Sequence, residues 1–342
     1  MRSVSNQPDL LLLVGHDDLD TVRIADGKAH ITGSTDLVNF LLPGEYHRLH
    51  VRPDMLKKGP RPLIDGYRVI MNCITEAERS PRCLDAERKL LKGYRGRIIN
   101  PPEAILRTTR DQIARRMAGI ENLVVPRVHR FRARDGDGVV RALTQAGIRF
   151  PIIMRRPGTH AGEVVGRFDT IKEAAAAVEA AGEYLVTEFH DFRRADGLYR
   201  KARAYYFGGR RVFRHYFASD HWNVHVTARD RFMADRPETI AEEAAYFERP
   251  EGALPAKASD VLDAINARMG LDFFGIDFAI LDDGRVILFE TNATMNFFSN
   301  FRDPRFPAVA KCVKPGGEAF RALLGLPHLE FASTAPTQSE TE

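Results

Sequence analysis

The stretch LDFFGIDFAILDDGRVILFETNATMNF, residues 271–297, decides the fold. It holds two apolar, β-rich runs, FFGIDFAIL and RVILFETN, on either side of an Asp-Asp-Gly turn signal, and it predicts a β-hairpin. A two-residue turn at Asp283-Gly284 places Asp277 opposite Glu290 on the neighbouring strand. Facing residues lie roughly 5 Å apart at Cβ, and like charges there repel each other. A divalent cation between the two carboxylates would remove that conflict.

The same register pairs Ile280 with Ile287 nearer the turn. Asn292 lies two residues beyond Glu290 and therefore points to the same face of the strand. Two carboxylates and an amide oxygen form an all-oxygen ligand set, which suits Mg²⁺ or Mn²⁺ and not zinc. The alternative is a half-buried hairpin with exposed acids. Because the acids interrupt otherwise continuous apolar strands, we favour a metal site that includes Asp277.

The hairpin sequence G-I-D-F…G-x-V-I-L-F-E-x-N-A resembles the metal-binding core of the ATP-grasp superfamily, which includes D-alanine–D-alanine ligase, glutathione synthetase and the RimK-type ligases. Asp277, Glu290 and Asn292 match that motif in type and spacing. The resemblance implies that they bind two Mg²⁺ ions, which bridge the phosphates of ATP. It covers residues 105 to 325, and the segment before it matches only in kind.

Composition is that of a folded protein, with 44% hydrophobic and 28% charged residues among 342. A net charge of +4 is compatible with anionic ligands such as nucleotides, but it is weak evidence for nucleic-acid binding. The widely spaced Cys73, Cys83 and Cys312 form no zinc pattern and fit a reduced, cytoplasmic setting. No apolar stretch has transmembrane length. These features predict neither a nucleic-acid nor a membrane partner.

We divide the chain into three folded units and a tail. Residues 1–104 alternate apolar runs with polar or helical segments, which predicts an open α/β lobe with a largely parallel sheet. Residues 105–190 form a second unit, and residues 191–330 form a third with two hairpins and a helix near 257–269. Residues 331–342 are polar and are expected to be disordered. The fold class is α/β, with α+β character in the C-terminal part. The resemblance implies an N-terminal lobe before a two-lobed ATP-grasp module.

The segment PIIMRRPGTHAGEVV, residues 151–165, reads as a strand followed by a glycine-containing loop. Gly158 and Gly162 would let backbone N–H groups approach phosphate oxygens. A plain hairpin turn is the alternative. The resemblance places Arg155 where the family has a phosphate-binding lysine, and Arg110 at its second nucleotide-binding lysine. Arginine keeps the charge and adds a bidentate fork, so phosphate binding survives the change at Arg155. Arg110 is the nearest match to the second lysine, and Arg107, Arg115 and Arg116 lie close by.

The segment YLVTEFHDF resembles the hinge strand that holds adenine in ATP-grasp enzymes. The resemblance implies that Glu188 lies near the adenine amino group. A later acid would take the ribose hydroxyls, and Asp191 and Asp196 are both candidates. The alternative for these acids is an exposed position at a strand end.

A second hairpin turns at Gly208-Gly209, and outward pairing places Arg203 opposite Arg214. Two facing arginines are unfavourable unless an anion lies between them. ATP phosphates or an acyl phosphate would be such an anion, and both arginines are therefore candidate catalytic residues. The alternative is that both side chains extend into solvent.

Three histidines follow, His215, His221 and His225, next to the only tryptophan. Their spacings of six and four lie in a stretch without clear helical character, and no carboxylate completes a zinc set. We expect them to line a cleft.

The family pattern fails at one position. Peptide-type ligases often carry an arginine two residues before the metal-binding aspartate, and this chain has Gly275 there. Either another arginine supplies the charge that steadies the reaction intermediate, for which Arg302 and Arg305 after the second strand of the first hairpin are candidates, or the acceptor chemistry differs.

The resemblance implies a glutathione synthetase-like, ATP-dependent and Mg²⁺-dependent carboxylate–amine or carboxylate–thiol ligase. Such an enzyme forms an acyl phosphate, releases ADP and phosphate, and acts on small-molecule substrates; related ligases often form homodimers. Two alternatives stay open. One is an ATP-grasp kinase that phosphorylates a small molecule and stops, and the other is a non-catalytic nucleotide-binding module.

Overall fold

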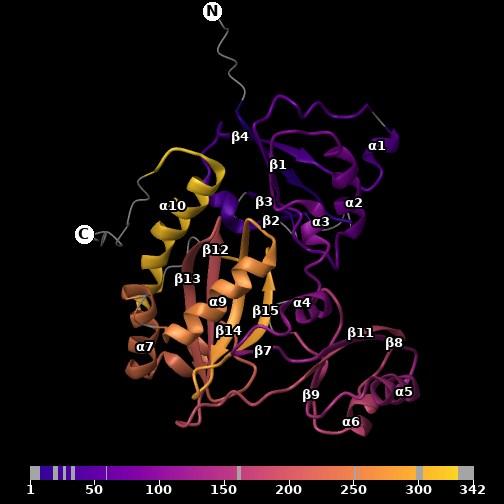
Figure 1. Ribbon diagram of the computed structural model, residues 1–342, viewed down its shortest axis with the longest axis vertical. Coiled ribbons are helices and arrows are strands. Elements are labelled where there is room, and N and C mark those ends of the chain that lie inside the picture. The colour runs from indigo at the N-terminus through magenta and orange to yellow at the C-terminus, as the bar shows by residue number, and fades with distance from the viewer. Residues whose placement is uncertain are drawn as a thin grey trace, which may run out of the picture.

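The computed structural model describes most of the chain, namely residues 8–17, 22–25, 28–31, 35–58, 60–159, 163–249, 252, 254–297 and 303–329. Figure 1 shows an N-terminal lobe at the top, a large sheet below it, and a smaller lobe at the lower right. Gly162, Arg302 and the expected disordered tail lie outside the described residues.

The N-terminal lobe is built on a parallel sheet of four strands in the order β4-β1-β5-β6. Its inner strand β1 pairs with β4 and β5 and is buried along its whole length, because helical segments such as η2 and α2 pack on the sheet. This confirms the expected open α/β fold with a largely parallel sheet in the N-terminal part of the chain. Its elements are β1 (Leu10–Val14), β2 (Val22–Ala25), β3 (Lys28–Ile31), η2 (Asp36–Phe40), β4 (Tyr46–His50), α1 (Met55–Lys58), β5 (Val69–Asn72), α2 (Pro81–Leu90), β6 (Arg97–Ile99) and α3 (Pro102–Ile105).

The smaller lobe is an antiparallel sheet in the order β10-β9-β11-β8, with two helices packed on it. The helix α6 begins with a capping box, in which Thr170 and Glu173 satisfy each other's backbone N–H groups. The elements are β8 (Val128–Ala133), α5 (Gly136–Ala146), β9 (Ile152–Arg155), β10 (Gly166–Phe168), α6 (Ile171–Ala176) and β11 (Gly182–Glu188).

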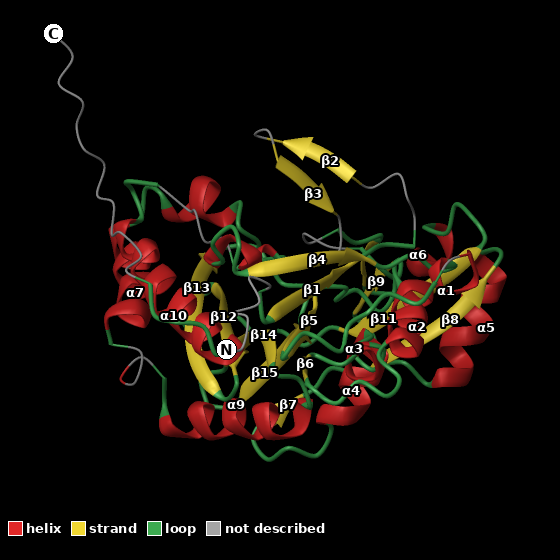
Figure 2. Ribbon diagram, turned by 90° about the horizontal axis from the view of Figure 1, so that it is seen from above, coloured by secondary structure: helices red, strands yellow, loops and turns green. Residues whose placement is uncertain are grey.

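The large sheet has the order β13-β12-β14-β15-β7, and α9 runs along one of its faces (Figures 1 and 2). Both expected hairpins are present, as β12–β13 and β14–β15. The elements are α4 (Arg110–Met117), β7 (Leu123–Val124), β12 (Tyr199–Phe207), β13 (Arg210–Ser219), η3 (Arg229–Met233), α7 (Pro237–Glu248), α9 (Ala256–Met269), β14 (Phe273–Ile280), β15 (Val286–Asn292), η4 (Pro307–Cys312) and α10 (Val313–Leu324).

Asp277 is opposite Glu290, as the sequence predicted, but the register near the turn differs. Ile280 pairs with Val286 and not with Ile287, because the connecting loop is one residue longer than a two-residue turn. A β-bulge then shifts the register between Asp277 and Phe278. The longer loop and the bulge shift the register in opposite directions, so they cancel at Asp277 and Glu290, the acidic pair.

The bulge also decides which face of β15 carries the acid. Val286 and Leu288 pack in the core under α9, whereas Glu290 lines a cavity on the other face of the sheet. The extra residue in β15 is Phe289. Without it, the two-residue alternation of a strand would direct Glu290 towards α9.

Residues 110–124 pack on the large sheet. The strand β7 pairs with β15, and Ile113 and Met117 of α4 share a core with Leu262 and Ile265 of α9. The domain boundaries near residues 104 and 190 stay a prediction. Among the described helices, none is both long and apolar enough to cross a bilayer.

Candidate active site

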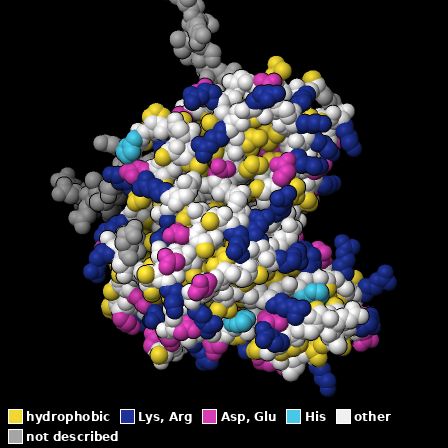
Figure 3. All heavy atoms as spheres, viewed as in Figure 1, with side chains coloured by type: hydrophobic (Ala, Val, Ile, Leu, Met, Phe, Trp, Pro, Cys, Tyr) yellow, Lys and Arg dark blue, Asp and Glu magenta, His cyan; other side chains and the backbone are white. Residues whose placement is uncertain are grey.

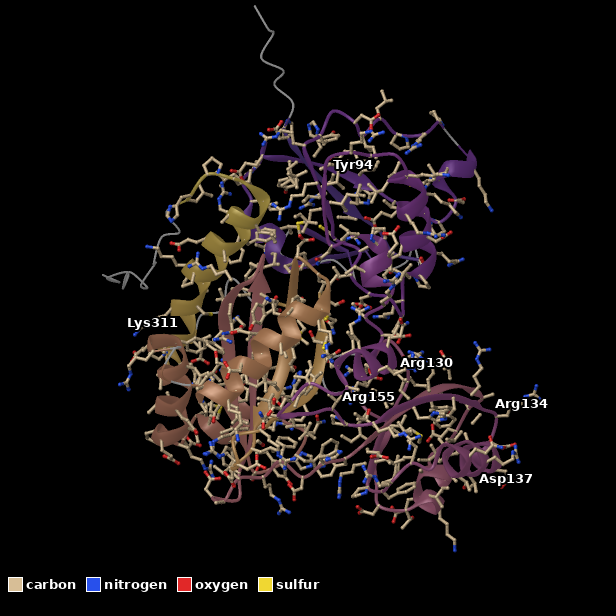
Figure 4. The ribbon with its side chains drawn as sticks, in the orientation of Figure 1. Tyr94, Arg130, Arg134, Asp137, Arg155 and Lys311 are labelled. Atoms are coloured by element: carbon tan, nitrogen blue, oxygen red, sulfur yellow. The ribbon has the colours of Figure 1, made fainter. Side chains whose placement is uncertain are left out.

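A cavity of about 600 Å³ lies where the three units meet. The N-terminal lobe contributes Glu76 and Arg79, the smaller lobe contributes Arg155, and the large sheet contributes Asp277 and Glu290. Figure 4 places Arg155 at the junction of the smaller lobe and the large sheet. Figure 3 shows an indentation in the outline between the N-terminal and smaller lobes, with Lys and Arg side chains near it.

One end of the cavity is apolar and lies beside the end of β11. Its wall includes Val125, Val128, Ile153, Phe189 and Ile287. This is the chemistry expected around a flat aromatic base. The location agrees with the predicted hinge strand.

The acids expected at this end are engaged elsewhere. Glu188 lines the cavity but is buried, and its carboxylate accepts hydrogen bonds from Arg149, from the backbone N at 3.0 Å and from Nη2 at 3.1 Å. Asp191 forms an ion pair with Arg193 at 2.6 Å and is not part of the cavity wall. Asp196 is likewise outside, paired with a neighbouring arginine. The structure therefore does not bring a ribose-binding acid to the cavity from these positions.

Arg155 is a half-buried cation with no acid in ion-pair contact among the described residues. In the described part of the chain it makes no hydrogen bond or ion pair, and its buried Nε has no acceptor. Burial, and then the neighbouring Arg110, lower the pKa of Arg155 to about 9. Arg110 itself forms an ion pair with Glu290 at 2.7 Å. Two guanidinium groups thus share one carboxylate, which leaves an excess positive charge where the sequence predicted phosphate binding.

Asp277 is buried beneath two cations. Arg203 donates to it from Nε at 2.6 Å and from Nη2 at 2.9 Å, and Lys201 Nζ lies 3.6 Å away. Burial raises the pKa of Asp277, but Arg203 and then Lys201 outweigh this effect and hold it below its usual range. Asp277 is therefore an ionised carboxylate on the floor of the cavity.

The expected metal site fits in part. Asp277 and Glu290 face the cavity from paired positions on neighbouring strands. Asn292 donates to Glu290 Oε1 at 2.8 Å, while its own Oδ1 accepts from the backbone N atoms of Thr294 and Met295. That oxygen would have to leave this turn before it could bind a cation. Within the described ranges, no three His, Cys, Asp or Glu side chains converge as a metal site.

Arg214 does not face Arg203, which corrects the predicted register. A second bulge, in β13, pairs Arg203 with His215 instead. The extra residue directs Arg214 away from the cavity wall, where it is buried against Phe297 and donates to its carbonyl oxygen. The predicted anion between two facing arginines therefore has no basis in this strand pair.

His215 occupies the position on the cavity wall instead. Its Nε2 lies 4.0 Å from Asp277 Oδ1, and its ring stacks on Phe217 with centroids 4.0 Å apart. Burial, Arg203 and other nearby cations hold the pKa of His215 well below its usual range, so the ring is neutral. His225 also lines the cavity, whereas His221 is exposed and does not.

The glycine positions are explained by packing. A Cβ on Gly275 would lie 2.6 Å from Met295 Sδ and 3.1 Å from Met295 Cβ, so a side chain at this position would have to displace Met295. Gly158 has a positive φ of 72° and would place a Cβ 2.9 Å from Arg79 Cγ, so the loop after β9 packs on the N-terminal lobe. Gly158 does not line the cavity. Arg305 pairs with Asp303 and also lies outside the cavity.

Sequence reasoning missed Lys201, Glu76 and Arg79. Lys201 could have been found, because it lies two residues before Arg203 on one strand and therefore shares its face. Glu76 and Arg79 lie in a loop of the N-terminal lobe, and no local pattern connects that loop to the large sheet.

No family model matches the chain, and no curated protein sequence matches it. Its structure is similar to that of VanG D-Ala:D-Ser ligase from Enterococcus faecalis, with a TM-score of 0.52, 11% identity, and coverage of 94% of this chain and 99% of that one. D-alanine–D-alanine ligase from Coxiella burnetii gives a TM-score of 0.52 at 14% identity, over 94% and 95% of the two chains. Carboxyaminoimidazole ribonucleotide synthase from Aspergillus clavatus, complexed with ATP, gives 0.51 at 13% identity, over 95% and 78%. The chain therefore has the ATP-grasp fold that its hairpin motif implied.

Proposed function

We propose that this protein is an ATP-dependent ligase, which activates a small-molecule carboxylate as an acyl phosphate and joins it to an amine or a thiol. The observation that carries the proposal is the excess positive charge of Arg155 and Arg110 beside Glu290, in a cavity between three units that also has an apolar end. A buried cation without an acid is costly unless an anion compensates it. The triphosphate of a nucleotide provides that anion, and its base would fill the apolar end.

In the proposed reaction, a carboxylate oxygen attacks the γ-phosphorus of ATP. The bond to the β–γ bridging oxygen breaks, and ADP leaves with the electron pair. An amine or thiol then attacks the acyl carbon, loses its proton, and displaces inorganic phosphate. Atoms and charge balance without any oxidant or reductant.

The chain's own contribution is positioning and charge neutralisation. Arg155 would hold phosphate oxygens from the smaller lobe. Arg110 would exchange its contact with Glu290 for the phosphates, which would free this carboxylate. A Mg²⁺ ion held by Glu290 and Asp277, with Asn292 as a further ligand once its turn opens, would neutralise the phosphate oxygens during transfer.

ADP release tests the proposal. Wild type and Glu290→Ala would be incubated with Mg²⁺-ATP and pools of amino acids, dipeptides and small carboxylates, each with and without added amines. We expect ADP from the wild type only, dependent on both a carboxylate and an amine. Equal release from both proteins would contradict the metal assignment. ADP release that never needs an amine would identify the kinase alternative.

One observation favours a non-catalytic module as the second candidate. Asp277 and Glu290, the two acids expected to hold metal, are each neutralised by an arginine. A protein that only binds nucleotide would keep these ion pairs. ATP binding without turnover over the whole panel, with equal affinity in the presence of Mg²⁺ and of EDTA, would support this alternative.

A further inference from the structure

Lys201 is a buried ammonium group on the cavity side of β12. The strand alternates, so Ala202 and Ala204 pack under α9 while Lys201 and Arg203 face the cavity. The side chain of Lys201 is only 16% exposed. A buried ammonium group is stable only when a negative charge compensates it.

Asp277 does not supply that compensation in full. Arg203 holds this carboxylate by two short hydrogen bonds of 2.6 and 2.9 Å, whereas Lys201 Nζ remains 3.6 Å away. One carboxylate thus faces two cations. One positive charge is left in excess at the floor of the cavity.

The excess charge of Lys201 is separate from that of Arg155. Arg110 and Glu290 act on Arg155, whereas Asp277 and Arg203 act most strongly on Lys201 and Glu290 acts on it more weakly. Each of the other arginines on the described cavity wall forms an ion pair: Arg79 with Glu76, Arg110 with Glu290, and Arg203 with Asp277. The cavity therefore has two cations whose charge is only partly compensated, Lys201 beside Asp277 and Arg155 beside Glu290.

Two histidines add hydrogen-bonding groups beside Lys201. His215 is 4% exposed, and its Nε2 is buried without a hydrogen-bond partner among the described residues. His225 also lines the cavity, and Lys201 acts on it electrostatically. An ammonium group and imidazole N–H groups on one wall are donors suited to an anion with two oxygens.

We propose that Lys201, His215 and His225 form a second anion subsite, which holds the carboxylate that accepts the phosphoryl group. This inference rests on the proposed function and adds the location of the acyl donor. A carboxylate bound there lies across the acidic pair from the phosphates held by Arg155. One of its oxygens attacks the γ-phosphorus, while Lys201 stays beside the other, which becomes the acyl carbonyl oxygen.

The terminal phosphate of ATP is the other source of such an anion, and binding measurements separate the two. The variants are Lys201→Met, which removes the charge at similar length, and His225→Gln. The control is Lys172→Met, at an exposed lysine on α6. Affinity for the Mg²⁺ complex of a non-hydrolysable ATP analogue would be measured by calorimetry. Affinity for ¹³C-labelled acetate and succinate would be measured by NMR, with and without the analogue, and melting curves would verify folding.

We expect Lys201→Met to keep its affinity for the ATP analogue. Its affinity for acetate and succinate should fall by about tenfold or more, because it loses a charge-assisted hydrogen bond. His225→Gln should weaken carboxylate binding less, and Lys172→Met should change neither affinity. Weaker analogue binding with unchanged carboxylate binding would assign Lys201 to the terminal phosphate and overturn the proposal. So would unchanged carboxylate affinity in Lys201→Met, or no saturable carboxylate binding to the wild type. A wild type that binds carboxylate through Lys201 but never binds the analogue would instead contradict the proposed function.

Discussion

Arg203 on β12 and Asp277 on β14 are direct partners in neighbouring strands and form a two-bond ion pair. Their side chains are only 14% and 6% exposed. The pair therefore behaves as one electrostatic unit at the floor of the cavity. Changing either member leaves the charge of the other buried without its main partner.

Asp277→Asn should lower the free energy of unfolding by about 3–5 kcal/mol, because it leaves Arg203 and Lys201 buried without a carboxylate. Arg203→Met should cost a similar amount. The double variant should lose less free energy of unfolding than the sum of the two single losses, by at least about 1 kcal/mol. Urea unfolding followed through Trp222 would measure this. Additive effects would show that the ion pair does not act as a unit.

Arg155→Met should affect binding and stability in opposite directions. Loss of the guanidinium should weaken ATP binding by about ten- to a hundredfold. Removing an unpaired, half-buried cation should leave the melting temperature equal or higher. Arg156→Met is the matched control, because Arg156 lies over Tyr184 and donates to the carbonyl oxygen of Ala180 outside the cavity. The Arg156→Met variant should be somewhat less stable than the wild type and should keep its affinity for ATP. Equal ATP affinity in wild type and Arg155→Met would reject the phosphate role.

Glu87 should make stability depend on pH. Its carboxyl is completely buried on α2, and its two oxygens have no hydrogen-bond partner among the described residues. Burial, and then the charge of Glu103, raise the pKa of Glu87 well above its ordinary value of 4.5. A pKa raised by folding gives stability that is complete below pH 4.5 and is lost as the pH rises towards the folded-state value. The loss should approach about 1.4 kcal/mol per pH unit in that window.

Glu87→Gln removes the titrating group and keeps its shape. The variant should be more stable than the wild type at pH 7, and its stability should vary less between pH 5 and pH 7. Thermal unfolding across this range tests both points. A wild type with flat stability there would mean that Glu87 is ionised when folded.

Arg130 should hold the smaller lobe against the rest of the molecule. Its guanidinium contacts Glu78 of the N-terminal lobe, with an Nη1–Oε2 distance of 3.1 Å, Asp111 of α4 at 2.9 Å, and Glu183 of β11 at 3.2 Å. Arg130→Met should cost about 2–4 kcal/mol. It should also increase the radius of gyration in small-angle scattering. Arg132→Met, at a side chain 85% exposed, is the control and should change stability by less than about 1 kcal/mol.

The acidic pair shows how a local prediction succeeds and why its neighbour fails. Pairing outward from a two-residue turn placed Asp277 opposite Glu290, although the loop is longer and a bulge restores the register. In the second hairpin the turn was correct, but the bulge in β13 had no compensating offset, so His215 replaced Arg214. Bulges form where packing on both faces of a sheet favours an extra residue, and no turn signal encodes them.

Local sequence signals were enough to predict the two hairpins, the parallel N-terminal sheet and the closeness of Asp277 to Glu290. Alternation of apolar residues and turn chemistry act over a few residues, and such signals are readable along the chain. Only the tertiary structure decided which cation neutralises which acid, and that Arg155 and Lys201 lack full partners. It also decided that the carboxylate of Glu188 accepts hydrogen bonds from Arg149 and is not available to a ligand in the cavity. These outcomes depend on side chains from three separate units meeting in one cavity, and no local pattern specifies the distances between such units.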